Sequence, residues 1–250
     1  MGSFRIAGAL LLTLAAGIAQ AADLTFVTED FPPFTYAEDG KAAGPFVEVI
    51  AAVCRAVQRD CAVSVMPWRR ALEMAESGEA QGIFTVLDTP QRREKFTVTP
   101  PIAQAAYAVF ATDPAFAYRT PADVKGRQIV AYGPSGTSIT AEEIIARSGG
   151  GGELVLESSN VNVLKKLDAG RYKDGIALVN RDVARHLIRT EAIAGVRHAG
   201  DAKDILYAIG LSKAGMSAAD QAAFLDATAA VKASGAVRAI FERYGLKAAE

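Results

Sequence analysis

The sequence has few of the residues that build metal sites, and it has no excess of basic residues. Its 250 residues include two histidines and two cysteines, so a His/Cys metal site has little to work with. The formal net charge is -1, which gives no reason to expect nucleic acid or an anionic membrane as a partner. Half of the residues are hydrophobic and 22% are charged, which is typical of a globular protein.

Long hydrophobic runs are missing as well, apart from one near the N-terminus. After Met1–Arg5, which is short and basic, Ile6–Ile18 is apolar but too short to span a bilayer. Ala19-Gln20-Ala21 then has the small-x-small pattern that a signal peptidase needs. We therefore expect residues 1–21 to be a secretory signal cleaved after Ala21, with an uncleaved membrane anchor as the alternative.

Export changes how the two cysteines are interpreted. An oxidising compartment favours a disulfide between Cys54 and Cys61, and a pair of buried thiols is the alternative. A loop this short would stabilise the fold by about 2–3 kcal/mol on the chain-entropy model.

The first half of the chain alternates strand and helix patterns. Phe46, Ile50, Val53 and Val57 recur at helical spacing, and Gly78 stands where a left-handed helix cap is needed. The expected elements are strands at 24–28, 61–65, 82–87 and 105–111, and helices starting at Pro45, Arg69 and Pro90. This β-α-β-α-β order predicts a parallel sheet with helices on its faces.

The pattern restarts after Thr112-Asp113-Pro114, which is typical of a linker. The second set of expected elements comprises a short helix at Pro121, strands at 128–132, 153–157 and 175–179, and helices at 141–147, 161–167 and 181–189. The C-terminal stretch predicts a strand at 205–212, a helix starting near Ser217 and a last helix ending at Tyr244. We expect this tail to return to the first unit.

The segment Gly78–Pro101 (GEAQGIFTVLDTPQRREKFTVTPP) resembles a signature of the bacterial family 3 extracellular solute-binding proteins. These are periplasmic receptors for polar amino acids that serve ABC importers. Thr89, Arg92, Phe96 and Pro101 fall in register with the family pattern. The segments Glu29–Phe34, Gly136–Ser138 and Ser234–Tyr244, and the spacing of Cys54 and Cys61, also resemble family features.

The resemblance implies an α/β fold of the type II periplasmic-binding-protein kind. Each of two lobes would be a mostly parallel sheet with helices on both faces, and two hinge crossovers would lie near residues 111–113 and 200–203. Lobe I would comprise 22–111 plus 203–250, and lobe II would comprise 112–202. The implied partners are a small ligand and an inner-membrane ABC permease, the location is the periplasm, and the chain would act as a monomer without a cofactor.

Arg92 is the strongest candidate for ligand binding. A guanidinium can hold a carboxylate through two parallel hydrogen bonds, and the family places its carboxylate-binding arginine at this register. Arg93 and Lys95 are close to Arg92 in sequence, so a positive charge alone does not identify the ligand-binding residue. Trp68 and Phe31 would form the aromatic walls, or be packing residues, and Arg70 would be either a second cation in the site or a surface residue.

Two more groups of candidates come from strand and helix ends. Thr85 and Leu87 lie at the end of a strand, where ligands bind in open α/β sheets. Thr137 and Ser138 precede a predicted helix, whose free N–H groups favour an anion. With Arg92 they would hold a carboxylate from both lobes, and helix capping alone is the alternative.

Asn180 is a departure from the family pattern. Amino-acid receptors of this family usually carry an aspartate at this register, paired with the α-ammonium of the ligand. Asn180 has no charge, although Asp182 is close in sequence. Either Glu29 or Asp30 supplies the negative charge that Asn180 lacks, or the ligand is a carboxylate without an α-amino group.

Two other classes of function remain open. The fold could host a lyase or dehydratase that acts on a small carboxylate, with Glu29 or Asp30 as general acid. It could also be a sensory receptor that signals to a membrane kinase. We find no Ser/His/Asp order, no phosphate loop and no metal spacing, and we expect neither His186 nor His198 to act in the site.

Overall fold

The computed structural model describes residues 24–250, so the predicted signal sequence lies outside the described residues. The strands are β1 Leu24–Thr28, β2 Tyr36–Glu38, β3 Lys41–Ala43, β4 Cys61–Val65, β5 Gly82–Leu87, β6 Phe96–Val98, β7 Ala103–Ala111, β8 Gln128–Tyr132, β9 Glu153–Glu157, β10 Ile176–Asn180, β11 Arg197–Ser212 and β12 Lys247–Ala248. The helices are α1 Pro45–Ala56, α2 Trp68–Ser77, α3 Pro90–Lys95, the 3-10 helix Pro121–Val124, α4 Gly136–Arg147, α5 Asn160–Asp168, α6 Arg181–Thr190, α7 Ala218–Ala233 and α8 Ala236–Arg243.

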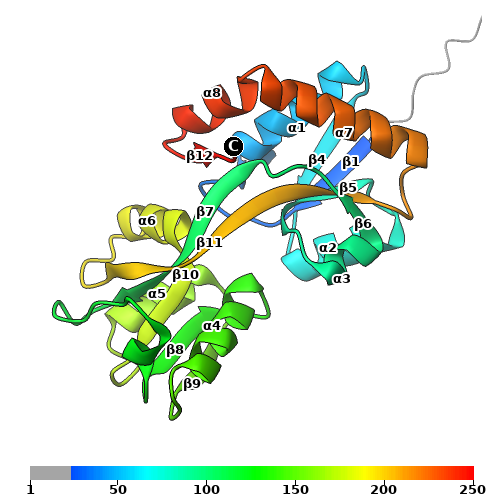
Figure 1. Cartoon of the computed structure of the whole chain (residues 1–250). Coiled ribbons are helices and arrows are strands. Elements are labelled where there is room, and N and C mark those ends of the chain that lie inside the picture. Colours follow the sequence, from blue (N-terminus) through cyan, green and yellow to red (C-terminus); the bar gives the residue numbers. More distant parts are fainter. Residues whose placement is uncertain (1–23) are drawn as a thin grey trace, which may run out of the picture.

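Two lobes share one twisted sheet (Figure 1). The sheet runs β4-β1-β5-β11-β7-β10-β8-β9. The parallel strands β4, β1 and β5 belong to the first lobe, and the parallel strands β10, β8 and β9 to the second. Between them, the long antiparallel pair β7–β11 passes from one lobe to the other. The α/β class, the two lobes and the two crossing strands confirm the predicted fold.

The first lobe buries its sheet between two layers of helices. Phe26 in β1 packs on Phe224 of α7, whereas the next residue, Val27, belongs to a second core cluster with Ala71 and Ala75 of α2. Successive residues of a strand point to opposite faces, so a run of apolar residues in β1 serves both layers. Helices α1, α7 and α8 contact one another on one face, and α2 packs against β1 and β5 on the other.

The disulfide between Cys54 and Cys61 is present and ties α1 to the first residue of β4. The predicted pairing is therefore confirmed in the structure. Because β4 runs parallel to β1, with Cys61 opposite Leu24, this link lies at the amino ends of these strands.

Two boundaries differ from the predictions by more than two residues. Helix α4 begins at Gly136, so Thr137 and Ser138 lie in its first turn rather than before it, because Ser135 is the residue that caps the helix. Strand β11 begins at Arg197 rather than Ile205, because pairing with β7 imposes an extended backbone on a polar stretch. Its register shifts at 198–200 and 201–203, within the predicted second crossover. The lobe boundaries at 111/112 and 202/203 stay a prediction.

Candidate ligand-binding site

The carboxyl ends of the parallel strands bring the first-lobe candidates to one edge of the sheet. Glu29 directly follows β1, Trp68 stands three residues after the end of β4, and Arg92 lies in the helix that follows β5. These three strands are parallel neighbours, so the residues after them emerge on the same edge. Ligands bind at this edge in open α/β sheets.

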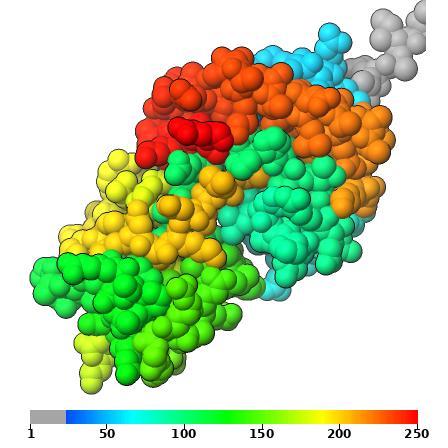
Figure 2. Space-filling view, viewed as in Figure 1, coloured from blue at the N-terminus to red at the C-terminus, as the bar shows by residue number. Residues whose placement is uncertain are grey.

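The second lobe presents the matching edge of its own strands. Tyr132 is the last residue of β8, Asn180 is the last residue of β10, and α4 begins four residues after Tyr132. The hydroxyl of Tyr132 donates a hydrogen bond of 3.3 Å to the carboxylate of Glu29, which connects the two edges. Figure 2 shows the surface indented between the teal residues of the first lobe and the green residues of the second.

A second contact between the edges involves Leu87 and Gly136. A Cβ atom on Gly136 would lie 3.1 Å from a methyl carbon of Leu87, and it would clash with the hydroxyl of Tyr107. Only glycine at this position lets the start of α4 approach β5 and β7 so closely. Leu87 therefore contributes an apolar side chain to the meeting point of the lobes.

Arg92 and Trp68 lie together, as the sequence predicts. The guanidinium carbon of Arg92 lies 5.7 Å from the centre of the Trp68 ring, a cation–π distance. One guanidinium nitrogen is 3.5 Å from the carboxylate of Glu76. Burial lowers the pKa of Arg92, and Glu76 partly opposes that shift. Within residues 24–250 this guanidinium donates no hydrogen bond, so its N–H groups are available to a ligand carboxylate.

Arg93 differs from Arg92 in its exposure and in its hydrogen bonds. Its guanidinium is exposed and forms a bidentate ion pair with Asp88, through bonds of 2.6 Å and 2.5 Å. The distinction that the sequence drew between the two arginines therefore has a structural basis, because the donors of Arg93 are already used.

Thr85 occupies a strained position in β5. Its φ of 62° lies in the left-handed region, which a β-branched residue rarely adopts. The pairing with β11 skips this residue, so Thr85 forms a bulge two residues before the end of the strand. Its hydroxyl donates to the carbonyl of Phe84 at 2.6 Å, so it is turned onto its own chain.

Phe31 packs mainly within the protein. Its ring stacks on Phe34 and meets Tyr207 edge to face, and only 9% of the residue is exposed. Arg70 is exposed on α2. Its neighbour Arg69 lies close enough to lower the pKa of Tyr132 in the second lobe, against the stronger effect of burial, which raises that pKa to about 12. Of this pair, Arg69 is the one whose charge acts across the gap between the lobes.

The second-lobe candidates use their polar atoms inside the protein. Ser135 accepts from the N–H groups of Thr137 and Ser138, and the hydroxyls of those residues bond to Tyr132, Ser135 or both. The amide oxygen of Asn180 accepts from the N–H groups of Asp182 and Val183 at 2.9 and 3.1 Å. The Asn180 nitrogen donates to Tyr207 at 3.1 Å. Both lone pairs of the Asn180 oxygen are therefore occupied.

Glu29 is the unusual ionisable group of the site. Burial raises its pKa to about 7, the hydrogen bond from Tyr132 opposes this shift, and the charge of Asp30 adds to it. No Lys, Arg or His of the described residues lies within ion-pair distance of Glu29. The sequence named Glu29 as a possible substitute for the missing aspartate and as a general acid if the chain were a lyase, and it did not single out Tyr132, Tyr107 or Tyr207.

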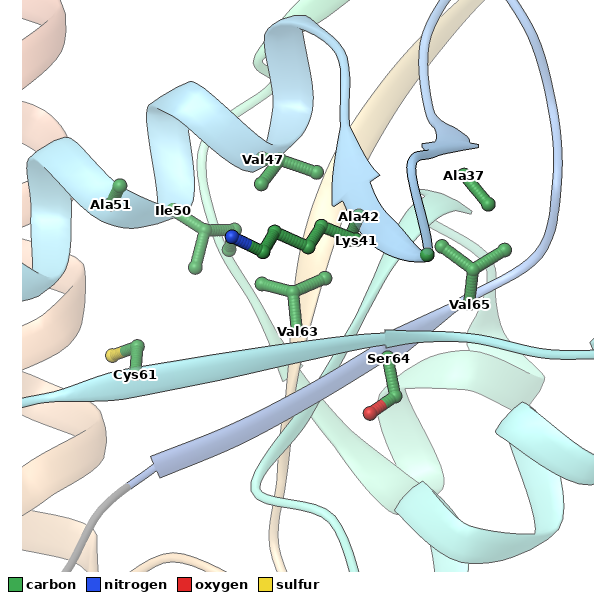
Figure 3. Close-up of a pocket in the computed structure, with 11 residues that line it drawn as sticks. Ala37, Lys41, Ala42, Val47, Ile50, Ala51, Cys61, Val63, Ser64 and Val65 are labelled. Atoms are coloured by element: carbon green, nitrogen blue, oxygen red, sulfur yellow. The ribbon is translucent and has the colours of Figure 1, made fainter.

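A separate pocket of about 490 Å³ lies in the first lobe, away from this edge. Figure 3 shows it between α1, β4 and the β2–β3 hairpin, with Lys41 extended past Val63 toward Ile50. Its lining is mostly aliphatic and contains no carboxylate or arginine. Lys41 is the one charged residue of this lining, so the pocket offers a single cation and no partner of opposite charge to orient a small polar molecule.

No helix within residues 24–250 is long and apolar enough to cross a bilayer. In the same part of the chain, no three His, Cys, Asp or Glu side chains are placed to hold a metal ion.

The fold and the paired strand edges define a two-lobed binding protein. Residues 24–247 match the family described as bacterial extracellular solute-binding proteins, family 3. The chain belongs to this family, which confirms the resemblance drawn from the sequence. None of the curated proteins compared gives a significant sequence match.

Several solved structures are similar in fold. A histidine kinase sensor domain with similarity to periplasmic binding proteins superposes with a TM-score of 0.80 and 20% identity, covering 92% of this chain and 99% of that one. An ancestral arginine-binding protein bound to arginine superposes with a TM-score of 0.77 and 18% sequence identity, and the match covers 90% of this chain and 98% of that one. A third structure is the amino acid ABC transporter substrate-binding protein AbpA from Streptococcus pneumoniae, bound to L-arginine. Its TM-score is 0.73 and its sequence identity is 21%, and the match covers 88% of this chain and 93% of that one.

Proposed function

We propose that this chain captures a small polar ligand that bears a carboxylate, most simply an amino acid or a related compound, and delivers it to an ABC permease. The observation that carries the proposal is Arg92, a partly buried guanidinium whose hydrogen-bond donors are unused, stacked beside Trp68 at the ligand-binding edge of the first lobe. A carboxylate there would gain two charge-assisted hydrogen bonds. Binding without turnover agrees with a family and structural neighbours that are binding proteins.

The proposal includes where and how the chain acts. We infer export to the periplasm after cleavage of residues 1–21, and action as a monomer whose lobes close about β7 and β11. The register shifts in β11 support this hinge, since bulges bend a strand and weaken its pairing locally. Thr85, Leu87, Thr137 and Ser138 would surround the ligand mainly through backbone groups and shape, because the three hydroxyls are already bonded.

The test is a thermal-shift screen of the mature chain against L-amino acids, small mono- and dicarboxylates and polyamines. A ligand at about a thousand times its Kd should stabilise the protein by roughly 4 kcal/mol. Arg92→Ala should weaken binding of the best ligand about a hundredfold, and the matched control Arg93→Ala should change it less than twofold. Equal losses in the two variants, or binding that survives Arg92→Ala, would contradict the site.

A sensory role is the second candidate, favoured by the similarity to a histidine kinase sensor domain. The two roles differ in what the loaded protein activates. If the chain serves transport, adding it with ligand should stimulate ATP hydrolysis by a liposome-embedded importer from the same organism. Stimulation of a membrane kinase with no effect on any importer would establish the sensor role instead.

A further inference from the structure

Small side chains leave a pocket open on the first lobe, away from the edge at which the strands end. Its walls belong to α1, β4 and the β2–β3 hairpin, and they carry Ala37, Ala42 and Ala51, with Gly40 in the turn (Figure 3). Alanine and glycine fill little space, so a volume of about 490 Å³ remains between these elements. Protein interiors normally pack as densely as organic crystals, and small molecules bind in pockets of roughly 300–1,000 Å³. The pocket is therefore large enough for a small ligand.

The surface of this pocket is aliphatic. Ile50 is fully buried, whereas Val47, Val63 and Val65 are half-buried and line the open volume. Ser64 lies between the two valines of β4 and points to the opposite side of the strand (Figure 3). Because covering apolar surface is favourable in water, this lining favours a ligand with an aliphatic body.

Lys41 brings one positive charge to this aliphatic surface. Its side chain extends past Val63 toward Ile50 (Figure 3). Glu38 stands opposite Lys41 in the hairpin, but none of the ion pairs within residues 24–250 joins the two. No residue of the lining is acidic. An ammonium without a partner attracts an anion, and the alkyl stem of lysine lies readily along an apolar surface.

We propose that this pocket binds a monocarboxylate with an unbranched aliphatic tail, such as a medium-chain fatty acid. The tail would lie against Val47, Ile50 and Val63, and the carboxylate would pair with the ammonium of Lys41. The site shares no residue with the candidates at the carboxyl edges of the two lobes. It therefore goes beyond the proposed function and does not depend on it.

The tail and the carboxylate should contribute unequally to binding. Each methylene group that leaves water tightens binding by up to about fourfold, so octanoate should bind roughly four to sixteen times more tightly than hexanoate. Exposed ion pairs contribute little, so loss of the charge at Lys41 should weaken binding only about threefold. Reversal of that charge should exclude a carboxylate, because two like charges would then face each other.

The experiment is an NMR titration of the isotope-labelled mature chain at about pH 7, where carboxylic acids are ionised. The probes are butanoate, hexanoate, octanoate and octylammonium. The variants are Lys41→Gln, Lys41→Glu and Ala51→Leu, the last of which fills part of the pocket. Lys173→Glu, in an exposed turn before β10, is the matched control for charge. Arg92→Ala tests whether the carboxylate binds between the lobes instead, and thermal unfolding checks that each variant is folded.

The proposal expects octanoate to shift the resonances of Ile50, Ala51 and Val63 along a saturable curve. Octanoate should bind more tightly than hexanoate, and octylammonium should bind weakly. Lys41→Glu should abolish octanoate binding and allow octylammonium to bind. Ala51→Leu should weaken octanoate about tenfold, because its side chain takes the place of part of the tail. Lys173→Glu and Arg92→Ala should each change the affinity for octanoate less than twofold.

Three other results would overturn the proposal. Equal binding of octanoate and octylammonium, or octanoate binding that is unchanged in Lys41→Glu, contradicts the role of Lys41. Octanoate binding that is lost in Arg92→Ala but kept in Lys41→Glu places the carboxylate between the lobes. If octanoate produces no saturable shift at Ile50 and Val63, the pocket binds no such ligand, and the proposed function is unaffected by that result.

Discussion

The two lobes meet through the same kind of strand edge, yet they present different chemistry there. The first lobe offers charges that lack hydrogen-bonded partners of opposite sign, in Glu29 and Arg92. The second lobe offers polar groups that are already bonded to one another, in Thr137, Ser138 and Asn180. Unused charges can bind a ligand, whereas satisfied polar groups mainly hold their own lobe together. The difference supports the proposal that the first lobe recognises the ligand and the second closes over it.

Stability should be distributed unevenly as well, because among the described residues only the first lobe carries a disulfide. Replacing both Cys54 and Cys61 by Ala should lower the free energy of unfolding by about 2–3 kcal/mol. Ligand affinity should stay within about twofold, because the link lies at the amino ends of the strands and the site at their carboxyl ends. Thermal unfolding measures the loss of stability, and calorimetry on the same samples measures the affinity. A large loss of affinity would contradict the placement of the disulfide and the site at opposite ends of the strands.

Asn180→Ala tests whether the second lobe uses this residue for structure. The variant loses a helix cap and a hydrogen bond to buried Tyr207, which should cost about 2 kcal/mol of stability. Asn162→Ala is the control, because the side chain of Asn162 donates only to the exposed Ser158 and its loss should cost less than about 0.5 kcal/mol. If Asn180→Ala instead abolished binding while unfolding normally, Asn180 would be a ligand contact and the comparison of the lobes would be wrong.

Glu29 should make the free protein sensitive to pH. Its pKa is raised from 4.5 to about 7 in the folded chain, so its contribution favours folding below pH 4.5 and is lost as the pH rises through 7. Glu29→Gln, which carries no charge, should therefore gain about 1–2 kcal/mol relative to the native chain between pH 5 and pH 8. Unfolding without ligand at several pH values measures this gain. Parallel profiles for the two proteins would show that Glu29 is not desolvated.

Thr137→Val should have the smallest effect of the series. The hydroxyl contributes to the cap of α4, so its loss should cost up to about 1 kcal/mol of stability. The backbone N–H groups remain, and ligand affinity should change less than about threefold. A tenfold loss of affinity in calorimetry would place the Thr137 hydroxyl on the ligand and would make the second lobe a recognition surface too.

Much of the fold could be predicted from the sequence because the buried strands are short and apolar. Strands at 24–28, 61–65, 82–87, 128–132 and 153–157 have the bounds that their patterns predict. The first half of β11 was missed, since Arg197–Asp204 is polar and becomes a strand only by pairing with β7. The short strands β2, β3, β6 and β12 were missed for the same reason, because pairing with a partner, rather than their own apolar pattern, defines them.

The site could be predicted only in part. Arg92 was singled out because it falls in register with the family pattern, and Trp68 because it is the one tryptophan of the sequence. The structure places these two residues side by side. Arg70 stays a prediction, and the sequence alone could not separate it from Arg69, because adjacent helix residues point about 100° apart and the sequence does not fix the rotation of α2. Tyr132 contacts Glu29 from 103 residues away, and no local pattern indicates a contact between chain segments so distant.

The most direct test is a crystal structure of the mature chain with the ligand that the screen identifies. The account predicts that the ligand lies between the carboxyl edges of the two lobes, with its carboxylate hydrogen-bonded to Arg92. A ligand bound elsewhere, for example in the aliphatic pocket around Val63, or a carboxylate held without Arg92, would contradict it.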